Sequence, residues 1–256
     1  MIQVRPRLEG RTIVITGAAS GIGEATVRRA LAEGAYVAAV DHDAQRLEAL
    51  AAELGRDALG VFQADVRDEQ GPARVLEALA RDGRAVDGVV PCAGVTSGAT
   101  FLASELELWR RVFDINLMGV VIWTRACVAQ MVEAQSGAVV LIGSQLTHGG
   151  AAGNAAYVTS KGAIAALAKT MAFEVAGKGV RVNCLSPGAT ATPLLANAMA
   201  KRPDPEAAAE RSRQRHAMRR FGEPQEIAGA ACFLLSDEAS FITGAELLAD
   251  GGWAVA

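Results

Sequence analysis

A chain of 256 residues, 51 % of them hydrophobic, can bury a sizeable core and is long enough for one large α/β domain. Its formal net charge of −3 argues against a general nucleic-acid surface, which would need a basic excess. No run approaches the roughly 20 apolar residues of a membrane span, and the N-terminal residues lack the apolar stretch of a signal peptide. We therefore expect a soluble, cytoplasmic protein with no membrane partner.

The cysteines are widely spaced, with no CxxC pair and no neighbouring histidine. They are Cys92, Cys127, Cys184 and Cys232. This spacing favours reduced core residues over a disulfide or a metal site, so no metal is expected.

Short β-type runs alternate with helical stretches along the whole chain. Strands are expected at residues 12–16, 36–41, 58–64, 88–91, 138–142, 180–185 and 246–249. Helices are expected before about residue 33, from the capping residue Asp43 to about residue 54, and over about 106–134, 153–177 and 224–235. Strands that are apolar on both faces and separated by helices predict a doubly wound, Rossmann-like α/β fold with helices on both faces of the sheet.

One segment interrupts this alternation. Residues 186–221 contain no expected strand, carry three prolines at 193, 203 and 205, and become dense in charge. A long insertion in a compact domain is usually a functional loop, so we expect a substrate lid at about 189–221. With no repeat and no linker, residues 1–256 are expected to form a single catalytic domain.

A glycine-rich turn follows the first expected strand. It reads Thr16-Gly17-Ala18-Ala19-Ser20-Gly21-Ile22-Gly23. Between a strand and a helix, such glycines let the backbone turn sharply and approach a pyrophosphate at the helix N-terminus. The turn therefore predicts a dinucleotide site that includes Gly17, Ser20, Gly21, Ile22 and Gly23.

Asp41 ends the second expected strand, 18 residues after Gly23. A carboxylate there accepts hydrogen bonds from the adenosine ribose and repels a 2′-phosphate. The nearby positions that would have to supply a compensating cation are Ser20 and His42, and neither is a fixed positive charge, so we favour NAD over NADP. The alternative is that Asp41 caps a helix, but Asp43 is better placed to do so. Asp65 and Val66 end the third strand and either meet the adenine or form a simple turn.

Tyr157 and Lys161 stand at positions i and i+4 of an expected helix, one above the other. A tyrosine with an ordinary pKa near ~10 is a poor base at neutral pH. A cation one turn away favours the phenolate and lowers that pKa. In isolation such a pair is usually a solvated helix surface, but the dinucleotide turn favours a proton-transfer role.

At this point the chain resembles a known family. Thr16–Gly23, Asn116, Ser144, Tyr157, Lys161 and Pro187-Gly188 fall in the order and spacing of the short-chain dehydrogenases/reductases, and the similarity extends to Asp250-Gly251-Gly252. The resemblance implies one domain with a seven-stranded parallel sheet, usually assembled as a homotetramer or dimer. The helices at 106–134 and 153–177 are candidates for pairing between subunits.

The resemblance also implies roles for particular residues. Tyr157 would be the general acid/base, and Ser144 would hydrogen-bond the substrate oxygen. Lys161 would bind the nicotinamide ribose and lower the pKa of Tyr157, and Asn116 would hold a water of the proton relay. Four further residues would lie along the nicotinamide: Pro187, Gly188, Thr192 and, as a weaker candidate, Thr190. A secondary alcohol needs a base, an oxyanion donor and a hydride acceptor, which Tyr157, Ser144 and the cofactor supply.

After the fourth strand this chain departs from the family. The usual Asn-Asn-Ala-Gly is replaced by Pro91-Cys92-Ala93-Gly94. Proline removes an N–H at the carboxyl end of the strand, which puts local support of the sheet and of the cofactor edge in question. Ala93 and Gly94 remain as expected cofactor contacts.

The C-terminal part resembles cytosolic-type 3-hydroxybutyrate and sugar-acid dehydrogenases. The matching stretches are Asp204-Pro205-Glu206, Arg220-Phe221, Glu226-Ile227-Ala228 and Asp250-Gly251-Gly252-Trp253. Five arginines crowd ten residues of the lid, namely Arg211, Arg213, Arg215, Arg219 and Arg220. One of them, Arg215, is a candidate for binding an anionic substrate. Alternatively, they form a solvated helix face paired with Glu206 and Glu210.

His148 follows Ser144 by four residues and either lines the substrate pocket or is a loop residue, whereas His42 and His216 are expected at the surface. The sequence thus predicts an NAD-dependent oxidoreductase acting on a secondary alcohol or ketone, including a hydroxy acid or sugar-derived compound. The alternatives are a 3-oxoacyl-thioester reductase of the same family and a catalytically silent NAD-binding regulatory protein.

Overall fold

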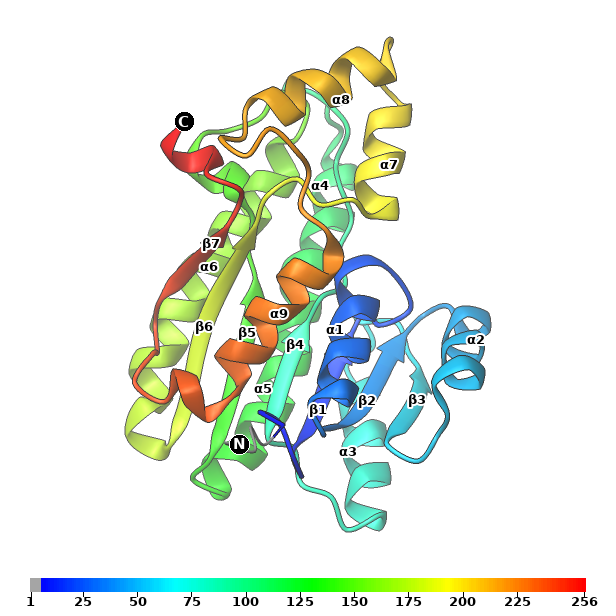
Figure 1. The fold of residues 1–256 in the computed structure, drawn as a ribbon, viewed down its shortest axis with the longest axis vertical. Helices are drawn as coiled ribbons and strands as arrows, with labels where there is room; N and C mark the ends of the chain where they lie inside the picture. Colours follow the sequence, from blue (N-terminus) through cyan, green and yellow to red (C-terminus); the bar gives the residue numbers. More distant parts are fainter. Residues whose placement is uncertain (1–5) are drawn as a thin grey trace, which may run out of the picture.

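The computed structural model describes residues 6–256, which contain a seven-stranded parallel sheet in the order β3-β2-β1-β4-β5-β6-β7 (Figure 1). The strands are β1 (Thr12–Thr16), β2 (Tyr36–Asp41), β3 (Leu59–Gln63), β4 (Gly88–Pro91), β5 (Gly137–Ile142), β6 (Val180–Pro187) and β7 (Glu246–Ala249). The predicted doubly wound α/β fold is confirmed. The sixth strand is longer than expected, because it pairs with β7 as far as Pro187.

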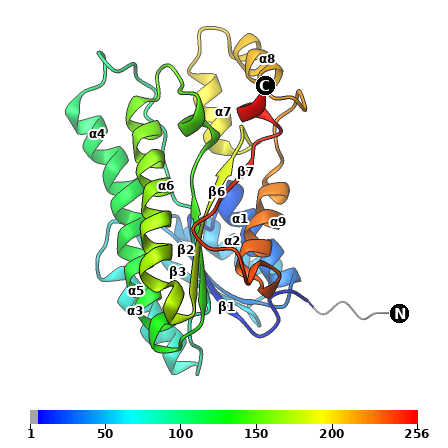
Figure 2. The same ribbon diagram turned by 90° about the vertical axis from the view of Figure 1, so that its left-hand side faces the viewer.

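Helices cover both faces of the sheet, as Figure 2 shows. They are α1 (Gly21–Ala32), α2 (Ala44–Leu54), α3 (Gly71–Arg81), α4 (Leu106–Phe113), α5 (Gly119–Glu133), α6 (Ala155–Val175), α7 (Pro193–Ala200), α8 (Pro205–Gln214) and α9 (Pro224–Leu235). Side chains alternate across the strands: Ile13 and Ile15 pack with α1, α2 and α9, whereas Val14 packs with α3, α5 and α6. This alternation explains why the strands are apolar at every position.

The chain reverses its direction of winding between β1 and β4. Strand β1 pairs with β2 on one side and with β4 on the other, so the connections that follow β1 and β4 leave the sheet in opposite directions. In such sheets ligands bind beyond the carboxyl ends of the strands at this switch point.

The helix expected over 106–134 is one continuous element, Leu106–Glu133, but it contains a π-helical turn at Asp114–Met118. Among the described residues it is the one helix long and apolar enough by composition to cross a membrane, which the expectation from the sequence did not foresee. Its α5 part packs against α3, β4 and β5, and its α4 part packs against α6. The helix is therefore a core element of this domain.

The segment expected as a lid contains α7 and α8 and stands beyond the carboxyl end of β6 (Figure 1). Its two ends meet: the Ala191 N–H donates to the Gly222 carbonyl over 2.8 Å, and the Gly222 N–H donates to the Ala189 carbonyl over 2.9 Å. The segment thus leaves the domain and returns to it at one point.

Candidate active site

A cavity of about 340 Å³ opens at the carboxyl ends of the strands around the switch point. Eleven of its lining residues were expected to bind the cofactor: Gly17, Ser20, Gly21, Ile22, Gly23, Asp41, Asp65, Val66, Ala93, Gly94 and Thr192. Others were missed, among them Arg67, Cys92, Arg111, Ile115 and Leu194. Arg67 follows Asp65 by two residues and Arg111 lies little more than one helical turn before Asn116, so proximity in sequence was the available signal.

The glycine turn packs more tightly than any side chain would allow. A Cβ on Gly17, whose φ is +65°, would lie 2.6 Å from the backbone nitrogen of Ala93. A Cβ on Gly23 would lie 2.0 Å from the Gly17 carbonyl oxygen. The two glycines therefore bring β1, the start of α1 and the loop after β4 together.

The start of α1 suits a phosphate. The helix begins at Gly21 in the cavity wall, and within the described chain its N-cap residue Ser20 makes no capping bond with its side chain. The N–H groups of that first turn are therefore open to an anion, where the helix dipole also favours negative charge. Thr192 closes the far side, because its Cγ2 lies 3.2 Å from where a Gly21 Cβ would be.

Asp41 lies at the end of β2 with its carboxylate buried in the cavity wall. It accepts hydrogen bonds from the N–H groups of Ala19 and Asp43, both over 3.0 Å, and its Oδ1 lies 2.9 Å from Nδ1 of His42. The helix cap is Asp43, which accepts from the Arg46 N–H over 3.1 Å. The alternative reading of Asp41 as that cap is therefore wrong.

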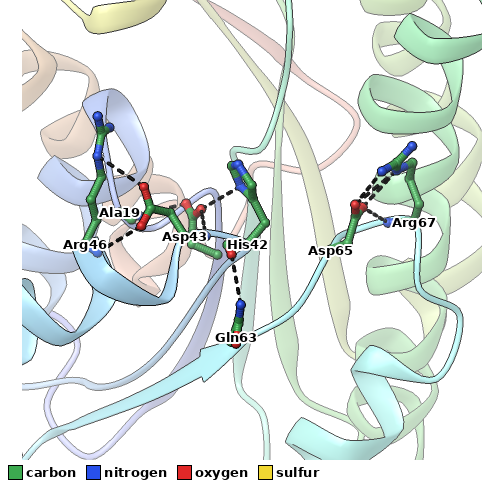
Figure 3. A network of polar contacts seen from close by, with 8 residues as sticks. Ala19, His42, Asp43, Arg46, Gln63, Asp65 and Arg67 are labelled. Atoms are coloured by element: carbon green, nitrogen blue, oxygen red, sulfur yellow. Dashed lines mark hydrogen bonds and ion pairs between the residues drawn. The ribbon is translucent and has the colours of Figure 1, made fainter.

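Two arginines near this end of the cavity are paired with carboxylates (Figure 3). Arg67 binds both oxygens of Asp65, with Nη2 2.6 Å from Oδ2 and Nε 3.0 Å from Oδ1, and this hydrogen bonding lowers the pKa of Asp65 to about 2. Arg46 Nε lies 3.3 Å from Asp43. The exposed His42 matches its expected surface position and adds a contact to Asp41.

Tyr157, Ser144 and Lys161 come together at the end of the site beyond Gly94. Tyr157 is partly buried, and burial raises the pKa of its phenol, although interaction with the Ser144 hydroxyl opposes that rise. Ser144 caps the 3₁₀ turn Gln145–His148 by accepting from the Leu146 N–H over 3.2 Å. The hydroxyl and the phenol are thus close enough to act on one substrate oxygen.

Lys161 is buried, and its expected effect on the pKa of Tyr157 is not found. Its Nζ donates to the Ile142 carbonyl over 2.8 Å and lies 5.9 Å from the centre of the Tyr157 ring. Burial lowers the pKa of the lysine itself to about 8, and a Gly94 Cβ would lie 3.9 Å from Nζ. The expected lowering of the Tyr157 pKa by Lys161 is not found in this structure, because burial dominates at both residues.

Asn116 is fully buried in the π turn of the long helix. Its Nδ2 donates to the Val95 carbonyl over 3.0 Å and to Ser160 Oγ over 3.1 Å, and its Oδ1 accepts from the Val95 N–H over 2.8 Å. These bonds use both amide hydrogens and one lone pair of Oδ1, leaving the second lone pair. Asn116 thus fixes the loop after β4 to α6 through Ser160, a partner that was missed in the sequence.

Pro91 is tolerated because β4 has separated from β5 before that residue. The register of β4 with β5 covers Gly88 and Val89, whereas its pairing with β1 continues to Pro91. Beyond it, the Cys92 N–H donates to the Thr16 carbonyl over 3.0 Å. Burial raises the pKa of the Cys92 thiol to about 12, so it remains protonated beside Lys161. The other three thiols are buried and, like Cys92, free, as expected.

The loop after β6 follows a fixed path. The Gly188 N–H donates to the Ala249 carbonyl over 2.8 Å, directly after Pro187 ends the strand. Thr190 is buried and turns its hydroxyl to the Gly188 carbonyl, at 2.9 Å. Thr192 instead caps α7 and faces the glycine turn. Of the two threonines, it is therefore the better placed to contact a cofactor.

On the substrate side, several side chains contact other protein groups. His148 is partly exposed, with Nε2 2.9 Å from Glu246 Oε1. The guanidinium of Arg215 lies 4.7 Å above the ring of Trp253, and Arg213 pairs with Glu206 and Glu210 as the solvated-face alternative predicted.

The prediction of a surface position for His216 is wrong. Its side chain is buried, with Nδ1 2.8 Å from the Ser212 carbonyl and Nε2 3.1 Å from Gln145 Oε1. The following residues return to the sheet and enclose the ring, which a charge-rich local sequence does not reveal.

Comparison with known proteins decides the family. Residues 17–254 match the family model described as enoyl-(acyl carrier protein) reductase. The chain is 35 % identical over 250 residues to a 3-oxoacyl-(acyl-carrier-protein) reductase of Thermotoga maritima, covering 96 % of this chain and 98 % of that one. It is 38 % identical to the D-threitol dehydrogenase of Mycolicibacterium smegmatis, covering 97 % and 95 %. The crystal structure of levodione reductase superposes with a TM-score of 0.92 at 34 % identity, covering 98 % and 100 %.

The chain is a short-chain dehydrogenase/reductase. It is therefore an oxidoreductase that acts on alcohol and carbonyl groups of a small molecule with a nicotinamide cofactor. The similarity to this family, first seen in the motifs, extends over nearly the whole chain.

Proposed function

We propose that this protein transfers a hydride between NAD(H) and a secondary alcohol or ketone, with Tyr157 as the general acid/base. The observation that carries the proposal is the grouping of Tyr157, Ser144 and Lys161 beside Gly94, a residue of the wall of the cavity that Asp41 also lines. The open N–H groups of α1 and the tight turn at Gly17 fit a dinucleotide pyrophosphate.

Each catalytic residue has a defined task in this proposal. Tyr157 removes the proton from the alcohol oxygen during oxidation and returns it during reduction, while Ser144 donates a hydrogen bond to the same oxygen. The nicotinamide, when bound, supplies or accepts the hydride at the carbon. Lys161, held at the Ile142 carbonyl, presents its remaining N–H groups toward the ribose, and Asn116 offers its second Oδ1 lone pair to a water of the relay. Pro187, Gly188, Thr190 and Thr192 form the wall on the nicotinamide side.

We infer a preference for NAD from the charges around Asp41. Its carboxylate stands in the cavity wall, and Arg46 and Arg67 are neutralised by Asp43 and Asp65. Arg111 reaches the same cavity from α4 and is the cation on which NADP use would depend. Initial rates measured with NAD⁺ and with NADP⁺ test this preference, and faster turnover with NADP⁺ would overturn it.

The substrate proposal is a hydroxy acid or a sugar-derived alcohol, taken under a lid at about 189–221. Arg215 and His148 are the candidate contacts, and a 3-oxoacyl thioester is the alternative substrate within the family. A panel of hydroxy acids, polyols, sugars and 3-oxoacyl thioesters, followed by the absorbance of the reduced nicotinamide, tests these classes. If the protein binds NADH but turns over no member of the panel in either direction, the catalytically silent alternative is favoured.

We also propose a cytoplasmic homo-oligomer, a tetramer or a dimer. The four free thiols suit a reducing compartment, and α4 leaves Leu106 and the neighbouring loop residues Phe101 and Leu102 exposed. Sedimentation of the purified protein would test the assembly, with a monomer as the contrary result.

A further inference from the structure

The turn that carries Ser144 is short and has a buried polar residue at its start. Ser144 lies between the end of β5 and the 3₁₀ turn Gln145–His148, whose Leu146 N–H it caps. A single 3₁₀ turn has little stability of its own, so the orientation of the Ser144 hydroxyl depends on what holds the turn. Gln145, the next residue, is 4 % exposed.

The side chain of Gln145 faces two segments distant in sequence. Its Oε1 lies 2.9 Å from the position of a Gly188 Cβ, which places the amide against the loop that follows β6. The same amide meets Nε2 of His216 at 3.1 Å, although 71 residues separate the two along the chain. Gln145 therefore contacts both the proposed nicotinamide wall and the end of the lid segment.

His216 is 2 % exposed and has a polar partner at each ring nitrogen. Its Nδ1 lies 2.8 Å from the Ser212 carbonyl, and its Nε2 lies 3.1 Å from Gln145 Oε1. The Ala189 N–H points at Nε2 over 3.4 Å, beside the Gln145 amide. One buried ring thus joins the last turn of α8, the loop after β6 and the turn after Ser144.

Few other buried side chains attach the lid segment. Within α7 and α8, all of whose residues the structure describes, none is buried. Other attachments are the backbone bridge at its base, the Met218 N–H to the Gly251 carbonyl, the pairing of Arg220 with Glu226 and the stacking of Arg215 on Trp253. His216 is the buried side chain of this segment that contacts the turn after Ser144.

We propose that His216 is a positioning residue: through Gln145 it sets the orientation of the Ser144 turn, and through Ser212 it ties that orientation to the lid. The proposal rests on the proposed function, in which Ser144 binds the substrate oxygen. Loss of the Gln145 side of the link is expected to lower kcat, because Ser144 acts on charge that develops in the transition state. Loss of the contact between His216 and the Ser212 carbonyl is expected to raise KM, because the lid segment is then held less firmly over the substrate.

Two substitutions separate the two sides of the ring. The amide of His216→Asn reaches the place of Nδ1 and keeps the Ser212 bond but not the Gln145 contact, whereas His216→Gln reaches the place of Nε2. We expect His216→Asn to lower kcat by about three- to tenfold with KM little changed, and His216→Gln to raise KM by a similar factor with kcat little changed. Equal effects of both variants on both constants would overturn the proposal.

Gln145→Met tests the link from its other end with a side chain of similar size. Combined with His216→Asn it is expected to lower kcat no further than the more severe single variant, since both remove one contact. If the fall in kcat of the double variant equals the product of the two single falls, the two residues act separately, which would contradict the proposal. Gln214→Ala is the matched control, because this exposed side chain bonds only Glu210 and Arg219 among the described residues.

Hydrogen exchange measures the link without any turnover. In His216→Asn we expect exchange of residues 145–150 to rise by about tenfold, with no such rise in Gln214→Ala. A change confined to residues 205–220 would refute the link even if the enzyme is active. An unreactive wild type with the expected exchange would instead count against the proposed function alone. If His216→Asn does not fold, Gln145→Met gives the same test, read as faster exchange in residues 205–216.

Discussion

The adenosine end of the cavity and the turn that carries Ser144 lie at the same edge of the sheet but are held in different ways. Around Asp41 the contacts are backbone groups: the N–H groups of Ala19 and Asp43 bind the carboxylate. The neighbouring glycine turn packs on the backbone of the loop after β4. This end therefore depends on chain path and on the absence of side chains.

Around Ser144 the contacts join side chains from distant segments. Gln145 meets His216, and His148 meets Glu246, whose Oε1 also accepts from Ser186 at 2.6 Å. Backbone contacts survive most substitutions, whereas a link between two side chains is lost when either changes. We therefore expect the substrate end to differ more readily between related enzymes than the adenosine end.

The largest effect is expected at the substrate end, from Tyr157→Phe. Without the phenolic proton carrier, kcat should fall by about 10²–10⁴-fold, while the dissociation constant of NADH, measured by fluorescence titration, should hold. Tyr36→Phe is the control, since Tyr36 lies at the start of β2 with Arg84 over its ring. Turnover of Tyr157→Phe near that of wild type would remove Tyr157 from the mechanism.

At the adenosine end, Gly17→Ala should be the most damaging change. The added Cβ meets the Ala93 backbone in a left-handed conformation, so we expect a loss of about 2–4 kcal/mol in the free energy of unfolding. Denaturant titration measures it. Gly229→Ala, in the middle of α9 with open space around it, should instead stabilise by about 0.5–1 kcal/mol. Equal stabilities of the two variants would show that the tight turn is not needed.

Asp41→Asn tests whether the charge at the adenosine end discriminates between NAD⁺ and NADP⁺. The ratio of kcat/KM for NAD⁺ to that for NADP⁺ should fall by about tenfold, or about 1.4 kcal/mol, because the repulsion of a 2′-phosphate is removed. Asp68→Asn makes the same change in net charge at a carboxylate that pairs with Arg74 outside the cavity lining. A similar fall in both variants would assign the effect to overall charge rather than to Asp41.

The smallest effect is expected from Arg215→Ala. Loss of the stacking on Trp253 should cost about 0.5–1 kcal/mol in unfolding free energy. If Arg215 also grips an anion, KM should rise for hydroxy acids and stay constant for neutral alcohols. A uniform KM for both classes would leave Arg215 with the stacking contact and remove it from substrate binding.

The difference between the two ends also decides what the sequence could predict. The glycine turn, Asp41 and the Asp43 cap follow from local rules, because each depends on residues a few positions apart. The strands were recognised because a sheet covered on both faces is apolar at each position. Helical spacing singled out Tyr157 and Lys161, the family resemblance added Ser144, and the structure brings the three together.

What the sequence could not predict depends on long-range packing. His216 is surrounded by charged neighbours in sequence, and its burial follows only from the return of the chain to β7 and Gln145. Burial, which no spacing reveals, raises the pKa of Tyr157 in this structure, and the Ser144 hydroxyl opposes that rise. Arg67 and Arg111 also line the cavity, and their closeness in sequence to Asp65 and Asn116 was the available signal for this.

The π turn at Asp114–Met118 has a consequence for how this helix can change over time. A π turn holds about one residue more than the α-helical turn it replaces, because its hydrogen bonds span five residues instead of four. The extra residue is absorbed within that turn, so α4 and α5 keep nearly the orientation they would have in an uninterrupted helix. Removing one residue there would let the segment return to regular α-helix with Arg111 still facing the cavity, whereas the wider turn that holds Asn116 would be lost. The helix can therefore change in length at this turn without moving its two halves, and the contacts at stake are those of Asn116.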